Sequence, residues 1–271
     1  MSFLESKRKR LERMMDEITG KDCCVAFSGG VDSSLILKTA VMAAGKKGSK
    51  VAAVTFDTAL HPAADISFAR ETAGQMGADH YVITVNELEE PEILNNPVNR
   101  CYLCKRMLFG KLLEFASDHG FSVVLEGTNK DDEGQYRPGI QAVEELGIVS
   151  PLRQLGFSKT EVRALAAELG IAAADRPSAP CLATRLPYGT RIDADILEKI
   201  DRGENFVRKL GFRNVRLRLH GDIVRLEVDR EDFPMLIEKA ELICCQLKKT
   251  GFSYITMDLE GFRSGSMDEN V

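Results

Sequence analysis

The chain has 271 residues, with 44% hydrophobic and 28% charged side chains and a formal net charge of −5. This length and composition suit one large globular domain or two smaller ones. No stretch approaches the roughly 18 consecutive apolar residues of a transmembrane helix, and Met1–Arg13 lacks a signal-peptide pattern. We therefore predict a cytoplasmic protein that contacts no membrane. Because its net charge is negative, we expect no general affinity for nucleic acid.

Short apolar strands alternate with helical segments along most of the chain. This alternation predicts an α/β fold in which helices cover both faces of a parallel sheet, with ligands bound at the carboxyl ends of the strands. The expected elements are, in order, a helix at Leu4–Ile18, a strand at Cys23–Phe27, a helix at Leu35–Ala44, a strand at Val51–Phe56, a helix at Ala64–Met76, a strand at His80–Val85, a helix ending near His119, a strand at Ser122–Gly127, and a helix that follows the capping box Ser158-x-x-Glu161 and runs through Leu169.

The pattern changes after Arg191, and we predict a boundary between domains 1–190 and 191–271. The second domain is expected to be a small α+β unit, in which Gly221-Asp222 forms a hairpin turn. Its expected elements are a helix at Asp193–Leu210, strands at Val215–His220 and Ile223–Asp229, a helix at Glu231–Lys249 and a strand at Phe252–Leu259.

A glycine- and serine-rich segment, Ser28-Gly-Gly-Val-Asp-Ser-Ser34, follows the first expected strand and precedes a helix. Glycines permit close approach of a ligand to the backbone, and a helix N-terminus presents unpaired N–H groups. With the serine hydroxyls, these groups form a cradle suited to phosphate or pyrophosphate. The segment is not a Walker A loop, because the chain contains no G-x-x-x-x-G-K-[ST] string.

The string SGGVDSS resembles the PP-loop of the ATP pyrophosphatases, which split ATP into AMP and pyrophosphate to adenylylate a substrate. The resemblance implies an adenine nucleotide alpha hydrolase-like fold, ATP as cosubstrate, and Asp32 as an organiser of phosphate and Mg²⁺. The residues expected to bind the nucleotide are Ser28, Gly29, Gly30, Asp32, Ser33, Ser34, Thr55, Gly127 and Arg137.

A second candidate site is the proline-bounded segment Pro180-Cys-Leu-Ala-Thr-Arg185. Arg185 can stabilise a thiolate at Cys181, and the thiolate is the reactive form of cysteine. Taken alone, Cys181 is equally well explained as a small buried hydrophobic residue.

Several segments together resemble the LarE family over nearly the whole chain. They are Glu126–Asp132, Tyr136–Gly139, Ser150–Leu152 and Pro180–Gly189. LarE proteins are ATP-dependent sulfur transferases of nickel-pincer nucleotide biosynthesis. The resemblance implies adenylylation of a carboxylate on a pyridinium dicarboxylate mononucleotide, sulfur delivery as a thiocarboxylate, and a homo-oligomer. It also implies that Cys181 is catalytic, together with Asp32 and Arg185; one branch of the family sacrifices this cysteine, leaving dehydroalanine.

Seven cysteines occur in the chain, and without an export signal we expect reduced thiols or metal ligands rather than disulfides. Cys101 and Cys104 form a C-x-x-C, and Cys181 supplies a third thiol. Three thiolates can hold a [4Fe–4S] cluster and leave its fourth iron open. Resemblance to the three-cysteine branch of the LarE family implies such a cluster. The alternatives are two thiols packed in a core and a sacrificial Cys181; we hypothesise the cluster.

Basic residues alternate with apolar ones in the expected strand Val215–His220, so Arg216 and Arg218 share one face. Two arginines at this spacing suit a phosphate group, and we predict that they bind the phosphate of a nucleotide-type substrate. A solvent-facing strand surface is the alternative. Two other functions also fit the whole chain: a PP-loop enzyme that thiolates tRNA, and a nucleotide-binding regulatory protein without catalysis.

Overall fold

The computed structural model describes residues 3–62, 64–133, 138–175, 180–263 and 265–268. The chain divides into two compact units, and each is described by itself. The first unit comprises Met1–Thr58, Ala63–Val85 and Cys101–Ser178, and the second comprises Ala59–Pro62, Asn86–Arg100 and Ala179–Val271. The segment that contains Cys181 is thus grouped with the C-terminal part of the chain.

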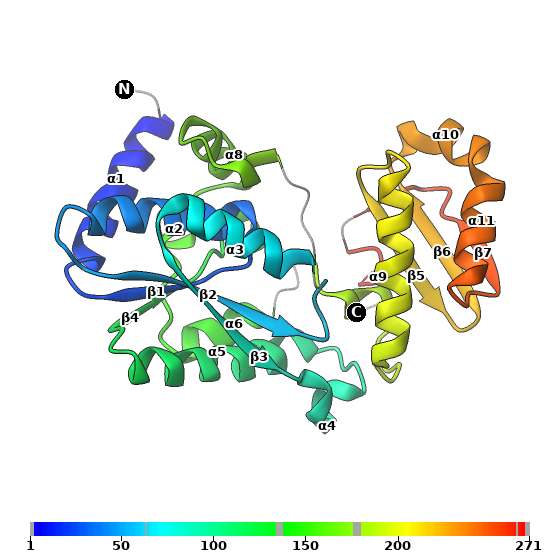
Figure 1. The fold of residues 1–271 in the computed structure, drawn as a ribbon, viewed down its shortest axis with the longest axis horizontal. Coiled ribbons are helices and arrows are strands. Elements are labelled where there is room, and N and C mark those ends of the chain that lie inside the picture. The colour runs from blue at the N-terminus through cyan, green and yellow to red at the C-terminus, as the bar shows by residue number, and fades with distance from the viewer. Residues whose placement is uncertain (1–2, 63, 134–137, 176–179, 264, 269–271) are drawn as a thin grey trace. The chain divides into compact units, whose positions relative to one another are not determined.

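The first unit is built on a four-stranded sheet in which every pairing is parallel (Figure 1). The strand order is β3-β2-β1-β4. The strands are β1 (Cys23–Ala26), β2 (Val51–Thr58), β3 (Asp79–Val85) and β4 (Val123–Leu125). The predicted parallel sheet is confirmed, although β4 is shorter than expected. Directly after it, the N–H of Glu126 donates to the carbonyl of Val149 at 3.0 Å, next to an isolated parallel bridge between Leu125 and Val149.

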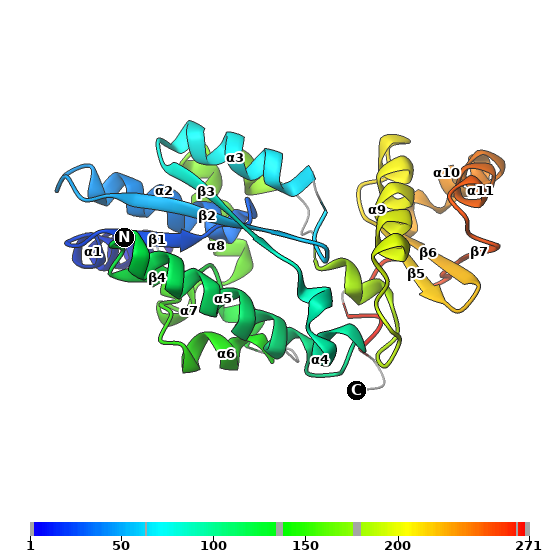
Figure 2. The same ribbon diagram turned by 60° about the horizontal axis from the view of Figure 1, so that its bottom comes forward.

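Helices cover both faces of this sheet (Figures 1 and 2). They are α1 (Phe3–Ile18), α2 (Val31–Ala44), α3 (Ala64–Met76), α5 (Arg100–Asp118), α6 (Gly139–Glu145), α7 (Pro151–Gln154) and α8 (Lys159–Glu168). Cys23 packs into the core beneath α1, α2, α3 and α8, whereas Cys24 packs into the core beneath α5 and α6. Burial raises the pKa of each of these thiols to about 12, so both cysteines are packing residues.

Helix α2 begins at Val31, four residues earlier than expected. Gly30 is its N-cap, with the extended dihedral angles φ −75° and ψ 162°. We expected Ser28–Ser34 to precede the helix, but Asp32 lies in its first turn, where the helix dipole favours an acidic side chain. The end of the glycine loop is therefore the first turn of a helix.

The second unit contains a three-stranded sheet of order β5-β6-β7. Strands β5 (Val215–His220) and β6 (Ile223–Val228) are antiparallel, and β7 (Tyr254–Met257) is parallel to β6. The predicted hairpin is confirmed, and Gly221 has φ +60° at its turn. Helix α9 (Ala194–Lys209) packs closely at Gly203, where a Cβ atom would lie 2.6 Å from a methyl of Leu217.

The helix predicted over Glu231–Lys249 is wrong as a single element. The structure has α10 (Phe233–Glu238) and α11 (Ala240–Lys249) instead. Between them Lys239 has φ −93° and ψ 6°, which ends one helix and starts the next. The second unit also contains α4 (Pro91–Leu94) and a 3₁₀ turn at Leu182–Arg185. Sequence periodicity could not detect such short elements.

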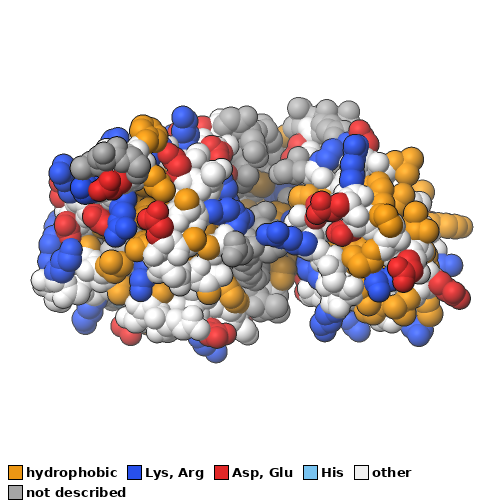
Figure 3. All heavy atoms as spheres, turned by 90° about the horizontal axis from the view of Figure 1, so that it is seen from above, with side chains coloured by type: hydrophobic (Ala, Val, Ile, Leu, Met, Phe, Trp, Pro, Cys, Tyr) orange, Lys and Arg blue, Asp and Glu red, His pale blue; other side chains and the backbone are white. Residues whose placement is uncertain are grey.

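Acidic and basic side chains are interspersed on the face shown in Figure 3, and hydrophobic side chains gather on the second unit. Exposed hydrophobic residues of that unit include Ile237 and Leu242, at 68% and 51% exposure. In the described part of the chain, no helix combines the length and apolar content needed to cross a bilayer.

Candidate active site

The glycine loop lies at the point where the sheet order reverses. From β1 the chain builds β2 and β3 on one side, whereas β4 pairs on the other side of β1. In open parallel sheets, ligands bind outside the carboxyl ends of the strands at such a switch point. Ser28 follows β1 and Gly127 follows β4, so both segments lie at this end of the sheet.

Serine hydroxyls brace the loop from within. The Oγ atom of Ser33 donates to the carbonyl of Gly30 at 3.1 Å and lies 3.3 Å from the Oγ of Ser28. The N–H of Gly30 in turn lies 3.3 Å from the Oγ of Ser28. Helix geometry leaves the N–H groups of the first turn of α2 without intrahelical acceptors. The arrangement is a preformed anion cradle at a helix N-terminus.

Two glycines allow the loop to pack closely. Gly29 has φ +70°, and a Cβ atom there would lie 3.1 Å from the ring of Phe68. At Gly127, a Cβ atom would lie only 2.8 Å from the backbone nitrogen of Ser33 and 3.1 Å from the backbone carbonyl carbon of Asp32. Gly127 therefore fixes the separation between the end of β4 and the cradle.

Ser34 differs from the other serines of the motif. It is 0% exposed, and its Oγ has no hydrogen-bond partner among the described residues. Ser33 is also buried, at 5% exposure, whereas Ser28 is exposed.

Asp32 is held by two side chains from distant parts of the chain. Its Oδ1 accepts from the Nδ2 of Asn129 at 3.1 Å, and its Oδ2 pairs with the ammonium of Lys159. The backbone N–H of Lys159 also donates to Asp131 at 2.7 Å. With side-chain exposures of 20% for Asp32 and 34% for Lys159, the pair is accessible beside the cradle.

Lys159 was not predicted as a site residue. The predicted capping box is confirmed, since Ser158 and Glu161 satisfy each other's N–H groups, and it makes Lys159 the first residue of α8. A cation in the first turn of a helix opposes the helix dipole. A lysine at this position is favourable only if an anion lies nearby. This conflict with the helix dipole was the signal in the sequence that could have identified Lys159.

Thr55 anchors β2 to the end of β1. Its hydroxyl donates to the carbonyl of Phe27 at 2.6 Å and lies 2.8 Å from the Nε2 of His80. Burial, and then the charge of Arg70, lower the pKa of His80. Thr55 is 5% exposed. The residue to which it donates, Phe27, directly precedes the loop. Arg137, also predicted to bind the nucleotide, lies outside the described residues.

The Cys181 loop, residues 180–189, belongs to the second unit. Cys181 is partly buried and caps the 3₁₀ turn Leu182–Arg185. Its carbonyl accepts from the Oγ1 of Thr184 at 2.7 Å and from the Nη1 of Arg185 at 3.1 Å. The other side of the Arg185 guanidinium makes two bonds to Glu204, of 2.8 and 2.9 Å. These bonds of Arg185 go to oxygen atoms and hold the loop backbone, rather than going to the sulfur.

Arg216 and Arg218 lie on the same face of β5 as predicted, and each is 4% exposed. Arg218 pairs with Glu227 at 3.1 Å and donates to the carbonyl of Thr184 at 2.8 Å. Arg216 lies opposite Glu227 in the β5–β6 register, and its guanidinium stacks over the ring of Phe262 at 5.1 Å. The face is thus an arginine-rich interior connected to the Cys181 loop, not a solvated strand surface.

Among the described residues around this loop, buried positive charge exceeds buried negative charge. Arg185, Arg216 and Arg218 are at most 4% exposed, and the carboxylates that face them are those of Glu204 and Glu227, both 0% exposed. Burial, and then the charge of Arg185, lower the pKa of Arg216 to about 10, while Glu204 acts in the opposite direction. Such an excess favours binding of an anion, which offsets the repulsion between the guanidinium groups.

Burial alone would raise the pKa of Glu204, but the hydrogen bond from Arg185 and the charges of Arg185, Arg208 and Arg216 hold it below its usual value. Glu204 therefore stays ionised and links α9 to the Cys181 loop.

Cys101 and Cys104 lie near the start of α5, three residues apart and both partly buried. This spacing places two thiols on one helix face. Cys101 and Cys104 are grouped with the first unit and Cys181 with the second. Within the described residues, no group of three or more His, Cys, Asp or Glu side chains is arranged to hold a metal ion.

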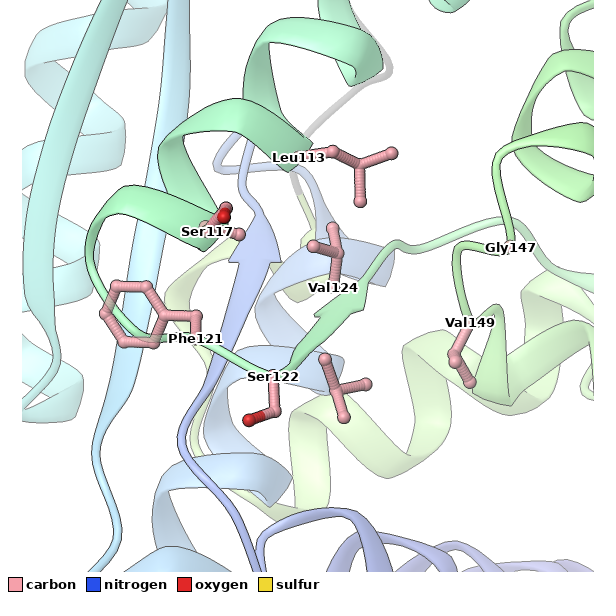
Figure 4. Close-up of a pocket in the computed structure, with 9 residues that line it drawn as sticks. Leu113, Ser117, Phe121, Ser122, Val124, Gly147 and Val149 are labelled. Atoms are coloured by element: carbon pink, nitrogen blue, oxygen red, sulfur yellow. The ribbon is translucent and has the colours of Figure 1, made fainter.

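A cavity of about 410 Å³ lies in the first unit, away from the glycine loop (Figure 4). Phe121, Ser122 and Val124 line it at the start of β4, together with Leu113 and Ser117 of α5. Because the strands are parallel, the amino end of β4 and the cradle lie at opposite ends of the strands. The cavity is therefore separate from the nucleotide site.

A glycine-serine loop between the first strand of a parallel sheet and a helix, placed at the switch point, fits the fold of the PP-loop ATP pyrophosphatases. In agreement, residues 11–128 match the asparagine synthase family. An uncharacterised protein of Synechocystis sp. is 37% identical over 268 residues, covering 98% of each chain. The pyridinium-3,5-bisthiocarboxylic acid mononucleotide synthase of Lactiplantibacillus plantarum is 35% identical over 271 residues, covering 100% of this chain and 97% of that protein. The chain belongs to the LarE family.

A more distant relative shares only part of the chain. The glutamine-hydrolysing GMP synthase of Aeropyrum pernix is 28% identical over 177 residues, covering 59% of this chain and 34% of that protein. The predicted family resemblance is thus confirmed, and the chain is an ATP-dependent enzyme of the PP-loop class.

Proposed function

We propose that the protein is an ATP-dependent sulfur transferase of nickel-pincer cofactor biosynthesis. A carboxylate oxygen of a pyridinium dicarboxylate mononucleotide attacks the α-phosphorus of ATP, and pyrophosphate leaves. A sulfur nucleophile then attacks the acyl carbon, and AMP leaves with the carboxylate oxygen, so the product is a thiocarboxylate. Similarity to a bisthiocarboxylic acid mononucleotide synthase along the whole chain is the observation that carries this proposal.

In the first step, the cradle binds the departing pyrophosphate. Ser28, Ser33 and the N–H groups at the start of α2 are its hydrogen-bond donors, and Lys159 adds a positive charge beside them. Mg²⁺, when bound, would offset the charge of the polyphosphate, and the partly exposed Asp32 carboxylate is an oxygen ligand of the kind that Mg²⁺ prefers.

In the second step, the buried arginines hold the substrate. We propose that Arg216 and Arg218 bind the phosphate of the mononucleotide, supported by the excess of buried positive charge around them. The bond from Arg218 to the carbonyl of Thr184 connects this phosphate site to the Cys181 loop. Substrate bound there would have its position defined relative to Cys181.

We propose that Cys101, Cys104 and Cys181 together bind a [4Fe–4S] cluster, which would supply an exchangeable sulfide. The chemistry of the residues fits this group, since all three are thiols and two of them share a helix turn. If the cluster were absent, Cys181 itself would donate sulfur and become dehydroalanine. The positions of the thiols and of Arg185 in the protein are the same for either route.

Iron analysis distinguishes the two routes. After anaerobic purification we expect stoichiometric iron and acid-labile sulfide, and Cys101→Ser should abolish multiple turnover while AMP formation continues. Protein without iron, or a Cys101→Ser variant with full multiple turnover, would rule out the cluster. In that case, mass spectrometry would find dehydroalanine at position 181, a mass decrease equal to one hydrogen sulfide, because the sulfur has passed to the thiocarboxylate.

The transferase reaction itself is tested with ATP, Mg²⁺ and a pyridinium dicarboxylate mononucleotide. We expect pyrophosphate, AMP and a thiocarboxylate in equal amounts for each sulfur inserted, with Asp32→Asn as an inactive control. Absence of substrate-dependent pyrophosphate release would refute the proposal. Pyrophosphate release that depends instead on tRNA would favour tRNA thiolation.

We also propose that the protein forms a homo-oligomer. The exposed side chains of Ile237 and Leu242 on the second unit support this, because hydrophobic side chains that gather on one surface often mark a protein interface. Light scattering on the wild type and on Leu242→Glu tests it. A monomeric wild type would refute it.

A further inference from the structure

The segment Asn86–Arg100 of the second unit contains a strained, fully buried asparagine. Asn96 has φ +49° and is the one non-glycine residue with positive φ in the part of the chain described. Its exposure is 0%. Asparagine tolerates the left-handed conformation better than most residues, yet such strain persists only where the surroundings enforce it, and it is often found at functional sites.

The surroundings that enforce it belong to the segment that follows Cys181. The Nδ2 of Asn96 donates to the carbonyl of Leu186 at 3.3 Å and to that of Pro187 at 2.8 Å. The backbone carbonyl of Asn96 accepts from the N–H of Gly189 at 2.9 Å. One asparagine thus makes three bonds to residues 186–189.

Arg100 completes the contact from the other side. It is 2% exposed, its Nη1 donates to the Oδ1 of Asn96, and it lies 3.5 Å from the carbonyl of Ala183. Its guanidinium lies over the ring of Tyr188 at 5.8 Å. Burial of a guanidinium is costly and requires hydrogen bonds of this kind. Cys101 follows Arg100 directly in the chain.

We propose that Asn96 and Arg100 form a clamp that positions Cys181 for sulfur transfer. The clamp fixes the 3₁₀ turn at Ala183, two residues after the cysteine, and the segment beyond it at Leu186–Gly189. Asn96 and Arg100 are positioning residues, because their contacts go to the loop backbone. The assignment rests on the proposed function for its catalytic meaning, whereas the hold on the backbone that follows Cys181 is given by the contacts themselves.

Substitutions at Asn96 separate the clamp from the strain. Asn96→Gly accepts φ +49° without strain but removes both side-chain donors. Asn96→Asp keeps the shape and the acceptor for Arg100, but it places a carboxylate against the two carbonyls. Asn95→Gly is the matched control, since Asn95 is the adjacent asparagine and is exposed.

The readout is the iodoacetamide alkylation rate of Cys181, measured by mass spectrometry on the full chain after chelator treatment in air. Exposed Cys245 in the same molecule is the reference. In Asn96→Gly and Asn96→Asp we expect the ratio of the Cys181 rate to the Cys245 rate to rise about fivefold or more, while Asn95→Gly leaves it unchanged. An unchanged ratio in whichever Asn96 variant folds would overturn the clamp, as would an equal rise in Asn95→Gly.

Turnover assays add the catalytic part. With substrate, we expect Asn96→Gly to keep pyrophosphate release and to lose thiocarboxylate formation by about a hundredfold, because loss of orientation acts on the second step. Equal losses in both steps would overturn the positioning role. If the wild type itself releases no pyrophosphate, the proposed function fails, and the alkylation ratios still decide the clamp.

Discussion

The contact between Gly127 and the cradle gives a sharp prediction for ATP binding. In Gly127→Ala, the new Cβ atom would lie 2.8 Å from the backbone nitrogen of Ser33, whereas ordinary contacts begin at 3.4 Å. The end of β4 or the first turn of α2 must therefore move by about 0.6 Å. Neither side can yield by side-chain rotation, since the close atoms belong to the backbone of Asp32 and Ser33 and to the Cβ of Asp32.

This shift displaces the N–H groups that face the phosphates. Since a misplacement of about 1 Å can cost about a hundredfold, we expect Gly127→Ala to weaken ATP·Mg²⁺ binding by about ten- to a hundredfold, or roughly 1.4–2.8 kcal/mol. Calorimetric titration measures this without a sulfur acceptor. Gly74→Ala is the matched control, because its Cβ atom would meet no atom within 4 Å. A folded Gly127→Ala protein that binds ATP as tightly as the wild type would refute the reasoning.

Three further predictions concern single side chains. Lys159→Met should weaken pyrophosphate inhibition about tenfold or more, and Lys159→Arg should restore part of it, because the charge beside the cradle is what matters. Because their thiol pKa values are about 12, Cys23 and Cys24 should resist iodoacetamide at pH 8 in the folded protein, whereas Cys245 should react. After unfolding, mass spectrometry should find Cys23 and Cys24 modified as well. Glu204→Gln should lower the free energy of unfolding by about 3–5 kcal/mol in urea titrations, because buried arginines lose their counter-charge. Since the pKa of Glu204 is depressed in the folded state, its ionised form stabilises the wild type above the unfolded-state pKa. This stabilisation should be lost as the pH falls through the folded-state pKa. Glu204→Gln should lack this pH dependence.

Local sequence patterns predicted the elements whose cause is local. The buried strand Cys23–Ala26, the glycine loop and the capping box at Ser158 follow from hydrophobic runs, glycine placement and side-chain acceptors, and the structure has each of them. The break at Lys239 was missed because helix propensity continues through it.

The chain's sequence alone identified three features of this protein: an anion cradle of the PP-loop type, a cysteine in a proline-bounded segment, and a family resemblance over nearly the whole chain. Tertiary structure alone decided which residues act together. Asn129 and Lys159 meet Asp32 across about a hundred residues or more of sequence, and the Cys181 loop is held by Asn96, some ninety residues earlier. Such pairs depend on how strands and helices pack, because periodicity identifies the face on which a residue lies but not its neighbour from another element.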